Sequence, residues 1–285
     1  MNSRSGKCGW AVEVWYWLWL AFGLLSLSCA SLLTAEDQYA APDLTVHEWG
    51  TFTAIAGNDG RAVLWQTLRG STDLPGFVDH FSTANFKSGL LGTIRMETPV
   101  LYFYTPRDVR VSVNVKFSQG VITEWYPHAT RAQPNEALRN TDLRRLRTSA
   151  SIAWDGIRVS PELNEEFPTE TRLNRYYAAR ETSSTPLSIE TKAGPQQEKF
   201  LFYRGVSAAS LPLSAAQNAS GDLLVKTLDD SEIPAVILFE RRGNRIGYRM
   251  VDAPTNDVIL QSPDLSGNLE SLREDLQKIL VNQGL

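Results

Sequence analysis

The stretch "VRVSVNVKF", residues 109–117, decides the fold class of this chain. Apolar and polar side chains alternate at every position along it. The apolar set is Val109, Val111, Val113, Val115 and Phe117, and the polar set is Arg110, Ser112, Asn114 and Lys116. Because successive side chains of a β-strand point to opposite faces, this alternation predicts a strand with one face in a core and the other in water.

The sequence on either side of this stretch predicts two more strands. "SQG" at 118–120 is a turn signal before "VITEWYP" at 121–127, and "TPRD" at 105–108 separates the stretch from "RMETPVLYFYT". The latter is apolar almost throughout from Val100 to Tyr104, which is typical of a strand covered on both faces. We therefore expect three consecutive antiparallel strands.

Strand patterns continue over most of the chain. They fall at 45–56 and 61–66, on either side of the turn "GNDG", and at 151–159, 199–206, 222–228, 234–240 and 245–251. Short helices are expected at 134–147 and 169–180. The fold class predicted is mainly β, an antiparallel β-sandwich-like architecture with short connecting helices and a C-terminal amphipathic helix.

The C-terminal helix is predicted from a regular apolar stripe. The stripe consists of Leu265, Leu269, Leu272, Leu276, Ile279 and Leu280 at three- and four-residue steps, and Gly284 and Leu285 resemble a Schellman cap. Either the stripe packs on the chain's own sheet, or it awaits a partner or a further layer of the protein.

The first thirty residues are predicted to be a secretory signal peptide. Arg4 and Lys7 precede an apolar run at 14–27, and Ser28-Cys29-Ala30 supplies small residues before a cleavage site. An uncleaved membrane anchor extending to Leu33 and a lipid on Cys29 are the alternatives. The domain plan is a signal peptide at 1–30, a polar linker at 31–43 and a β-rich domain at 44–285, with a sub-boundary near 130–195. The expected location is periplasmic or extracellular.

Charge excludes one class of partner. Removing the signal takes away two basic residues and one acidic residue, so 28 − 2 = 26 basic against 32 − 1 = 31 acidic residues give a net charge of −5 instead of −4. A binder of nucleic acid needs a basic stripe to neutralise phosphates, so this class is not expected. The basic cluster at 139–147 is interpreted as a solvated helix face. No Walker loop, dinucleotide fingerprint or Gly-x-Ser-x-Gly elbow occurs in the sequence.

Three histidines are the candidate metal ligands. His47, His80 and His128 lie far apart in the sequence, and none forms part of a local metal-binding motif. Three histidines can hold a catalytic zinc with one open position, provided the fold brings them together. The alternative interpretation, which the spacing favours, is three separate histidines that are exposed or hydrogen-bonded.

Two Glu-Trp dipeptides on predicted strands are the second candidate site. Glu48 and Glu124 are candidate catalytic carboxylates, because glycoside hydrolysis uses two carboxyl groups about 5 to 10 Å apart. Trp49 and Trp125 are candidate binding residues, because sugars commonly stack on aromatic rings. A structural use of these residues ranks first, glycan binding second and hydrolysis third.

The segment "HEWGTFT", residues 47–53, contains an anomaly. Strand alternation puts His47, Trp49, Thr51 and Thr53 on one face and Val46, Glu48, Gly50, Phe52 and Ala54 on the other. If the second face is buried, the Glu48 carboxylate needs a partner or a raised pKa. Gly50 indicates a bulge or a close backbone approach.

Several segments taken together resemble a known family. "VHEWGTFTAIAGNDGRAVLW", "DLPGFV", "RMETPVLYFYT", "ITEWYP" and "EKFLFYRGV" follow the order found in a family of uncharacterised exported bacterial proteins. The resemblance covers most of the chain after the signal. It implies export and a shared fold, and it implies no activity, cofactor or site.

These patterns favour an exported β-rich protein that binds a glycan or a protein. The first alternative is a metal-dependent hydrolase, in which His47, His80 and His128 hold zinc or another divalent metal and Glu48 or Glu124 acts as general base. The second is an assembly component that uses the C-terminal stripe. Whether the chain is an enzyme is left open.

Overall fold

The computed structural model describes residues 10–15, 43–65, 74–80, 91–117, 119–133, 149–171, 174–254 and 257–283. For 10–15 only the backbone is described. The helix expected at 134–147, with its basic cluster, lies outside the described residues. So do most of the predicted signal peptide and linker and the cap residues Gly284 and Leu285.

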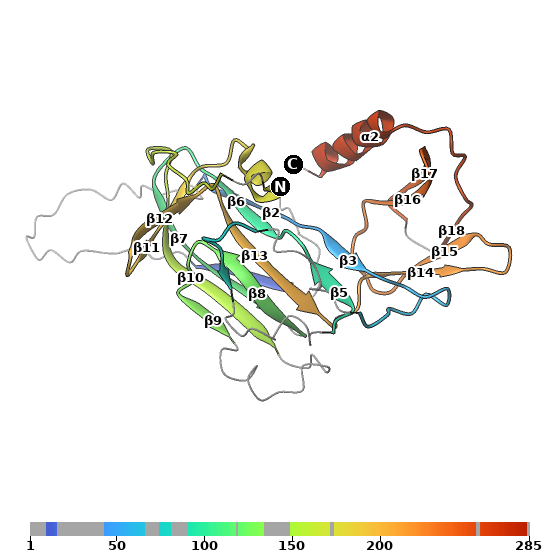
Figure 1. Ribbon diagram of the computed structural model, residues 1–285, viewed down its shortest axis with the longest axis horizontal. Coiled ribbons are helices and arrows are strands. Elements are labelled where there is room, and N and C mark those ends of the chain that lie inside the picture. Colours follow the sequence, from blue (N-terminus) through green and yellow to red (C-terminus); the bar gives the residue numbers. More distant parts are fainter. Residues whose placement is uncertain are drawn as a thin grey trace, which may run out of the picture.

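Two antiparallel sheets form the main body (Figure 1). The six-stranded sheet has the order β1-β7-β10-β11-β12, with β9 beside β10, and comprises β1 (Trp10–Trp15), β7 (Val109–Phe117), β9 (Arg131–Gln133), β10 (Ala150–Val159), β11 (Leu187–Thr191) and β12 (Gly194–Glu198). The seven-stranded sheet has the order β2-β6-β13-β5-β3, with β8 pairing with β13 and with β4. It comprises β2 (Thr45–Trp49), β3 (Phe52–Ala54), β4 (Asp79–His80), β5 (Ile94–Met96), β6 (Val100–Tyr104), β8 (Gly120–Tyr126) and β13 (Phe200–Ser207).

The core lies between the two sheets. Val111, Val113, Val115 and Phe117 of β7 are each 1% exposed, so the predicted alternation is confirmed. They pack in one cluster with residues of both sheets, including Trp154 of β10. The mainly β, sandwich-like fold expected from the sequence is the fold observed.

The prediction of three consecutive paired strands is wrong in its pairing. All three strands form where expected, but β6 and β8 belong to the seven-stranded sheet and β7 to the six-stranded one. The chain crosses between the layers at both turns. The reason is burial: all seven residues of β8 are buried, so both of its faces must be covered. A hairpin with β7 would place one face of β8 beside the polar, partly exposed face of β7.

Strand β1 falls within the predicted signal peptide. It pairs antiparallel with β7, from Trp10 opposite Phe117 to Trp15 opposite Ser112. Cleavage after Ala30 would remove this strand from the sheet and leave that edge of β7 without it.

No helix among the described residues is both long and apolar enough to cross a membrane.

The "GNDG" turn forms as predicted, although its strands find other partners. Gly57 N donates to Arg61 O at 2.9 Å, and Gly60 has a φ of 77°, which glycine adopts without strain. Past the turn, the bridge between Ala56 and Ala62 and a hydrogen bond from Val63 N to Ile55 O at 2.8 Å continue the hairpin. Residues 45–49 pair with β6 and 52–54 with β5, so this segment is built into the seven-stranded sheet.

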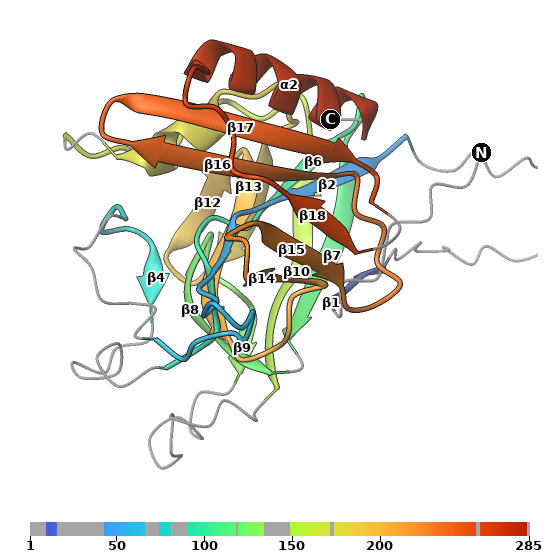
Figure 2. The same cartoon turned by 90° about the vertical axis from the view of Figure 1, so that its right-hand side faces the viewer.

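The strands after Ser207 pair only among themselves in the part of the chain that the structure describes. β14 (Leu213–Gln217), β15 (Leu223–Thr227) and β18 (Val258–Leu260) form one small sheet, and β16 (Ala235–Arg242) and β17 (Arg245–Asp252) form a hairpin. Figure 1 shows these strands and α2 (Leu269–Asn282) to the right of the main body, and in Figure 2 they face the viewer. The chain thus passes from the two main sheets to the small sheets after Ser207. The sub-boundary predicted near 130–195 lies before this point.

Helix α2 forms as predicted, and its apolar stripe is only partly covered: Leu272, Ile279 and Leu280 are half-buried, whereas Leu269 and Leu276 are exposed. The Asn268 side chain caps its N-terminus by accepting from Ser271 N at 2.9 Å, and Tyr248 of β17 donates to Asp275 at 2.7 Å. No residue of the helix is buried by the described part of the chain, and Leu269 is 65% exposed. The assembly alternative would use this face.

Candidate functional site

Glu48 reaches the core face of its sheet. Val46 and Glu48 lie opposite the core residues Phe103 and Leu101 of β6. The Glu48 carboxylate accepts a hydrogen bond from the hydroxyl of Tyr203, a residue that is only 2% exposed. The carboxylate that the sequence marked as anomalous therefore has a partner, a phenol of the sandwich core.

Gly50 ends the strand alternation. A Cβ at this position would lie 3.1 Å from Pro99 Cα, so the glycine serves a close backbone approach. Beyond it the chain leaves β6 and pairs with β5, and Phe52 is 38% exposed. The expectation that Phe52 shares a buried face with Glu48 is therefore wrong, because the strand is interrupted between them.

Burial raises the pKa of Glu48 above its ordinary value of 4.5, and the hydrogen bond from Tyr203 offsets part of this rise. Glu48 as a whole residue is exposed to solvent. Its carboxylate, however, is bonded to the buried Tyr203, and this end of the side chain is the desolvated part. A carboxyl group with a raised pKa in the folded state stabilises the fold at low pH. That contribution is lost as the pH rises through the folded-state pKa, since the unfolded chain then ionises more readily.

We expect Glu48→Gln to flatten the pH dependence of stability. The neutral amide has no ionisation cost, so the variant should gain stability relative to the parent as the pH rises from below 4.5 to neutrality. Urea unfolding at a series of pH values measures this. Tyr203→Phe should have the opposite effect, because it removes the hydrogen bond that favours the carboxylate. Parallel pH profiles for the parent and Glu48→Gln would contradict the assignment.

Glu48 and Glu124 do not form a catalytic pair. Glu124 pairs across the strands with Arg204, the neighbour of Tyr203, and successive side chains point to opposite faces. Glu124 is 2% exposed and accepts a hydrogen bond from Thr123. The two carboxylates thus lie on opposite faces of one sheet, which is not the arrangement that glycoside hydrolysis requires.

The two tryptophans also separate. Trp125 is 8% exposed and belongs to the core between the sheets, so it offers no ring to a ligand. Trp49 is 41% exposed and lies on the outer face, opposite Val100 of β6. Of the two candidate binding residues, the structure leaves only Trp49 accessible.

The three histidines are not brought together. His47 lies against the ring of Tyr104, with 5.2 Å between ring centroids. His80 pairs with Glu124 across β4 and β8, and His128 Nδ1 lies 2.6 Å from Asp79 Oδ2. Among the described residues, which include all three, no group of three or more His, Cys, Asp or Glu side chains could hold a metal ion. The sequence-based three-histidine site is therefore not formed.

A pocket of about 370 Å³ opens on the outer face of the seven-stranded sheet, beside Trp49. Aromatic rings and arginines dominate its lining. The lining residues are Trp49, Leu74, Arg95, Glu97, Thr98, Val100, Tyr102, Arg175, Tyr176, Ala178, Ala179, Phe200, Phe202 and Arg204. This size lies within the range of small-molecule sites, which are mostly apolar with a few polar groups in fixed positions.

One wall of this pocket is a short 3-10 helix, η2 (Arg175–Arg180), within the segment predicted to be helical. Tyr176 of η2 packs on Phe200 and Phe202 of the sheet. Glu198 is fully buried beneath it, paired with Arg180 at 2.6 Å and accepting from the Tyr176 hydroxyl at 3.0 Å. A buried, fully hydrogen-bonded ion pair thus fixes the wall of the pocket.

A second depression, of about 420 Å³, adjoins the first. It is lined by His47, Trp49, Tyr102, Tyr104, Glu181, Thr182 and Ser183. Trp49 and Tyr102 line both spaces. Burial raises the pKa of Tyr102 to about 12, so its hydroxyl stays protonated, and it donates to Ala179 O at 2.9 Å. We call the two depressions together the Trp49 groove.

Comparisons of the chain with protein-family models, curated proteins and solved structures gave no match. The family resemblance therefore stays a sequence-based expectation. The Trp49 groove has to be judged from its own chemistry.

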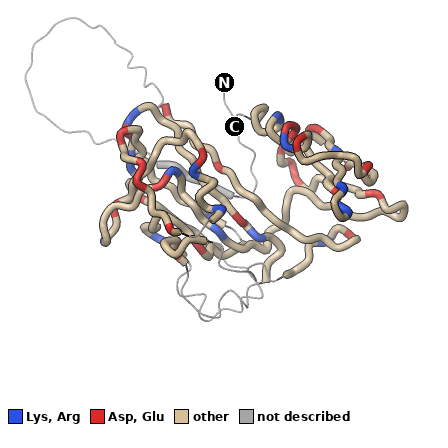
Figure 3. Tube along the Cα trace, turned by 45° about the horizontal axis from the view of Figure 1, so that its top comes forward, with Lys and Arg blue, Asp and Glu red and all other residues tan. Residues whose placement is uncertain are grey.

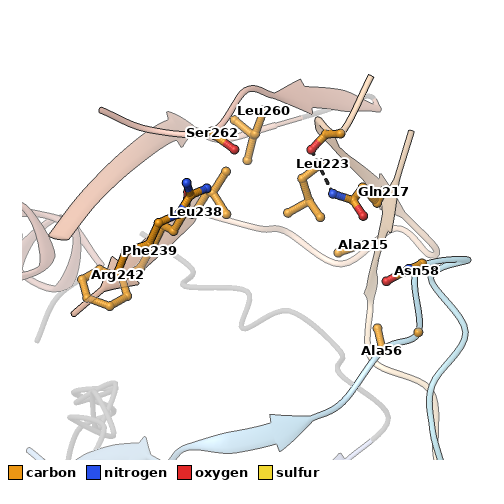
Figure 4. Close-up of a pocket in the computed structure, with 13 residues that line it drawn as sticks. Ala56, Asn58, Ala215, Gln217, Leu223, Leu238, Phe239, Arg242, Leu260 and Ser262 are labelled. Atoms are coloured by element: carbon orange, nitrogen blue, oxygen red, sulfur yellow. Dashed lines mark hydrogen bonds and ion pairs between the residues drawn. The ribbon is translucent and has the colours of Figure 1, made fainter. Parts of the chain in front are cut away.

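Another space, of about 430 Å³, lies between the 56–58 turn and the small C-terminal sheets. Figure 4 shows Leu223, Leu238 and Leu260 around it. Two of its polar side chains have partners within the lining: Arg242 pairs with Glu240 at 2.6 Å, and Gln217 donates to Gly221 O at 3.2 Å.

Sequence reasoning found Trp49 and missed most of its neighbours. Arg95 and Arg175 come from segments interpreted only as a strand and a helix, and Tyr102 was assigned to a buried strand. One pattern in the sequence could have indicated this face of β6. Tyr102 and Tyr104 alternate with Leu101 and Phe103, and the structure buries the latter two. Tyrosines at alternate positions indicate an accessible polar surface, because their hydroxyls require partners.

Proposed function

We propose that this chain is an exported carbohydrate-binding protein and that the Trp49 groove is its ligand site. Export rests on the signal-peptide pattern of the first thirty residues. The observation that carries the binding proposal is the exposed Trp49 ring between two depressions that are lined by hydroxyls, carboxylates and arginines. A sugar ring presents an apolar face for stacking and hydroxyl groups around its edge, and this combination suits it.

The supporting geometry is that of a preformed site. Trp49 is carried on a strand, and the opposite wall is held by the Glu198–Arg180 pair, so little ordering is needed on binding. No group of three or more His, Cys, Asp or Glu side chains among the described residues could hold a metal ion, so the metal-dependent alternative has less support than binding. What supports binding is the exposed Trp49 ring together with the polar lining of the groove.

We expect Trp49→Ala to weaken glycan binding by roughly 30-fold, about 2 kcal/mol, the loss typical of a central aromatic anchor. A glycan array first identifies a ligand of the purified protein, and isothermal titration then compares the variants. Phe239→Ala is the matched control, because Phe239 is 43% exposed and lies in the C-terminal part. Absence of any glycan ligand, or equal losses in both variants, would overturn the proposal.

A further inference from the structure

The Trp49 groove has a local charge opposite to that of the chain. Three arginines, Arg95, Arg175 and Arg204, line the 370 Å³ pocket, whereas Glu97 is the one acidic residue among the described residues of its lining. The whole chain carries a net charge of −4. Figure 3 shows charges of both signs spread along the described trace, so the arginine-rich lining is a feature of the pocket and not of the surface in general.

The three arginines differ in how far the protein already uses them. Arg204 is 6% exposed and donates to Glu97 O at 3.0 Å, so it helps to build the pocket floor. Arg175 is exposed on η2, and its side chain makes neither a hydrogen bond nor an ion pair with the described residues. Within that part of the chain, the donors of its guanidinium are open to a ligand.

Arg95 is the second arginine with donors to spare. Its Nε lies 3.3 Å from Glu97 Oε1, close enough for an ion pair. The same Nε is buried without a hydrogen-bond partner among the described residues, so the angle to Glu97 is poor and the contact is electrostatic only. A half-buried guanidinium with one buried, unbonded nitrogen favours a ligand that supplies a well-placed acceptor.

We infer that the glycan bound in this pocket is acidic and presents a carboxylate to Arg175 and Arg95. This inference rests on the proposed function. A guanidinium matches a carboxylate with two parallel hydrogen bonds, and such charge-assisted bonds are stronger than those to a neutral hydroxyl. Trp49 and Tyr102 then contact the sugar ring, while the two arginines select the uronic acid over its neutral counterpart.

The test compares pairs of oligosaccharides that differ only in this group. Short oligogalacturonates and oligoglucuronates are compared with their carboxyl-reduced forms, which keep the same linkages and stereochemistry. Titration with the purified protein should show at least about tenfold tighter binding of an acidic member than of its neutral counterpart. In Arg175→Gln this preference should fall to within about threefold.

Two controls make the outcomes separable. Arg110→Gln removes an exposed arginine from β7 on the other sheet and should leave the preference intact. Arg95→Gln should reduce the preference as well, and its melting temperature shows whether the variant folds. Binding of neutral and acidic members with equal affinity, or a preference that survives Arg175→Gln, would overturn the inference and leave the proposed function standing. No binding of either member of any pair would remove both.

Discussion

Glu198→Ala should lower the free energy of unfolding by about 3–5 kcal/mol, the cost of breaking a buried ion pair from one side. Glu198 is fully buried, and its two carboxylate oxygens accept from Arg180, from the Tyr176 hydroxyl and from the Lys199 backbone N–H. Removing the carboxylate leaves Arg180, which is 12% exposed, without its partner. Urea unfolding followed by circular dichroism measures the change.

Asp108→Ala is the matched control for this experiment. Asp108 also pairs with an arginine, Arg158, but the two side chains are 43% and 38% exposed. An exposed pair contributes at most about 1 kcal/mol, because water solvates the separated charges. Similar losses in the two variants would show that Glu198 has no special structural role. The Glu198 variant should also bind glycan less well, because Glu198 holds the hydroxyl of Tyr176, which lines the Trp49 groove.

Gly205→Ala should destabilise the fold by about 3 kcal/mol, the upper end of the range for overpacking in a core. A Cβ on Gly205 would lie 2.4 Å from Val121 O and 2.8 Å from Met96 Cε. The first of these is a backbone atom of the neighbouring strand β8, so it cannot turn away as a side chain would. Strands β8 and β13 would have to separate beside the bulge that lies between Arg204 and Gly205.

Gly267→Ala provides the comparison for this glycine. A Cβ there would meet its nearest atom, Gly247 Cα, at 3.5 Å, which is an ordinary contact distance. The expected change is within about 0.5 kcal/mol, as for most substitutions that create no clash. Thermal and urea unfolding of both variants tests the difference. A Gly205→Ala protein as stable as the parent would show that β8 and β13 are not in close contact at this point.

The positions of the longest strands could be predicted because their signals are local, whereas β11, β12 and β14 were not predicted. The alternation of β7 and the "GNDG" turn each involve residues adjacent in the chain. The pairing could not be predicted in the same way. β6 pairs with β2 and β13, and not with β5 or β7, which precede and follow it in the chain. Which strands pair therefore depends on how a whole layer is buried.

The candidate site shows the same division. Glu48-Trp49 and Glu124-Trp125 are identical dipeptides on strands, yet Trp49 is accessible and Trp125 is in the core. Their orientations are opposite because β2 directs Glu48 toward the core, whereas β8 directs Glu124 toward the outer face. Sequence alternation gives the relative direction of neighbours, but not which of the two directions is inward.

The sequence alone determined that this chain is a mainly β protein with a secretory-type N-terminal pattern, that Glu48 is anomalous on an apolar face, and that Trp49 is a candidate for binding. Only the tertiary structure decided that Tyr203 is the partner of Glu48, that the three histidines stay apart, and that Arg95 and Arg175 line one pocket with Trp49. The physical reason is distance along the chain. Strand formation depends on side chains a few residues apart, whereas Glu48 and Tyr203 are separated by 155 positions and meet only when the sheet is complete.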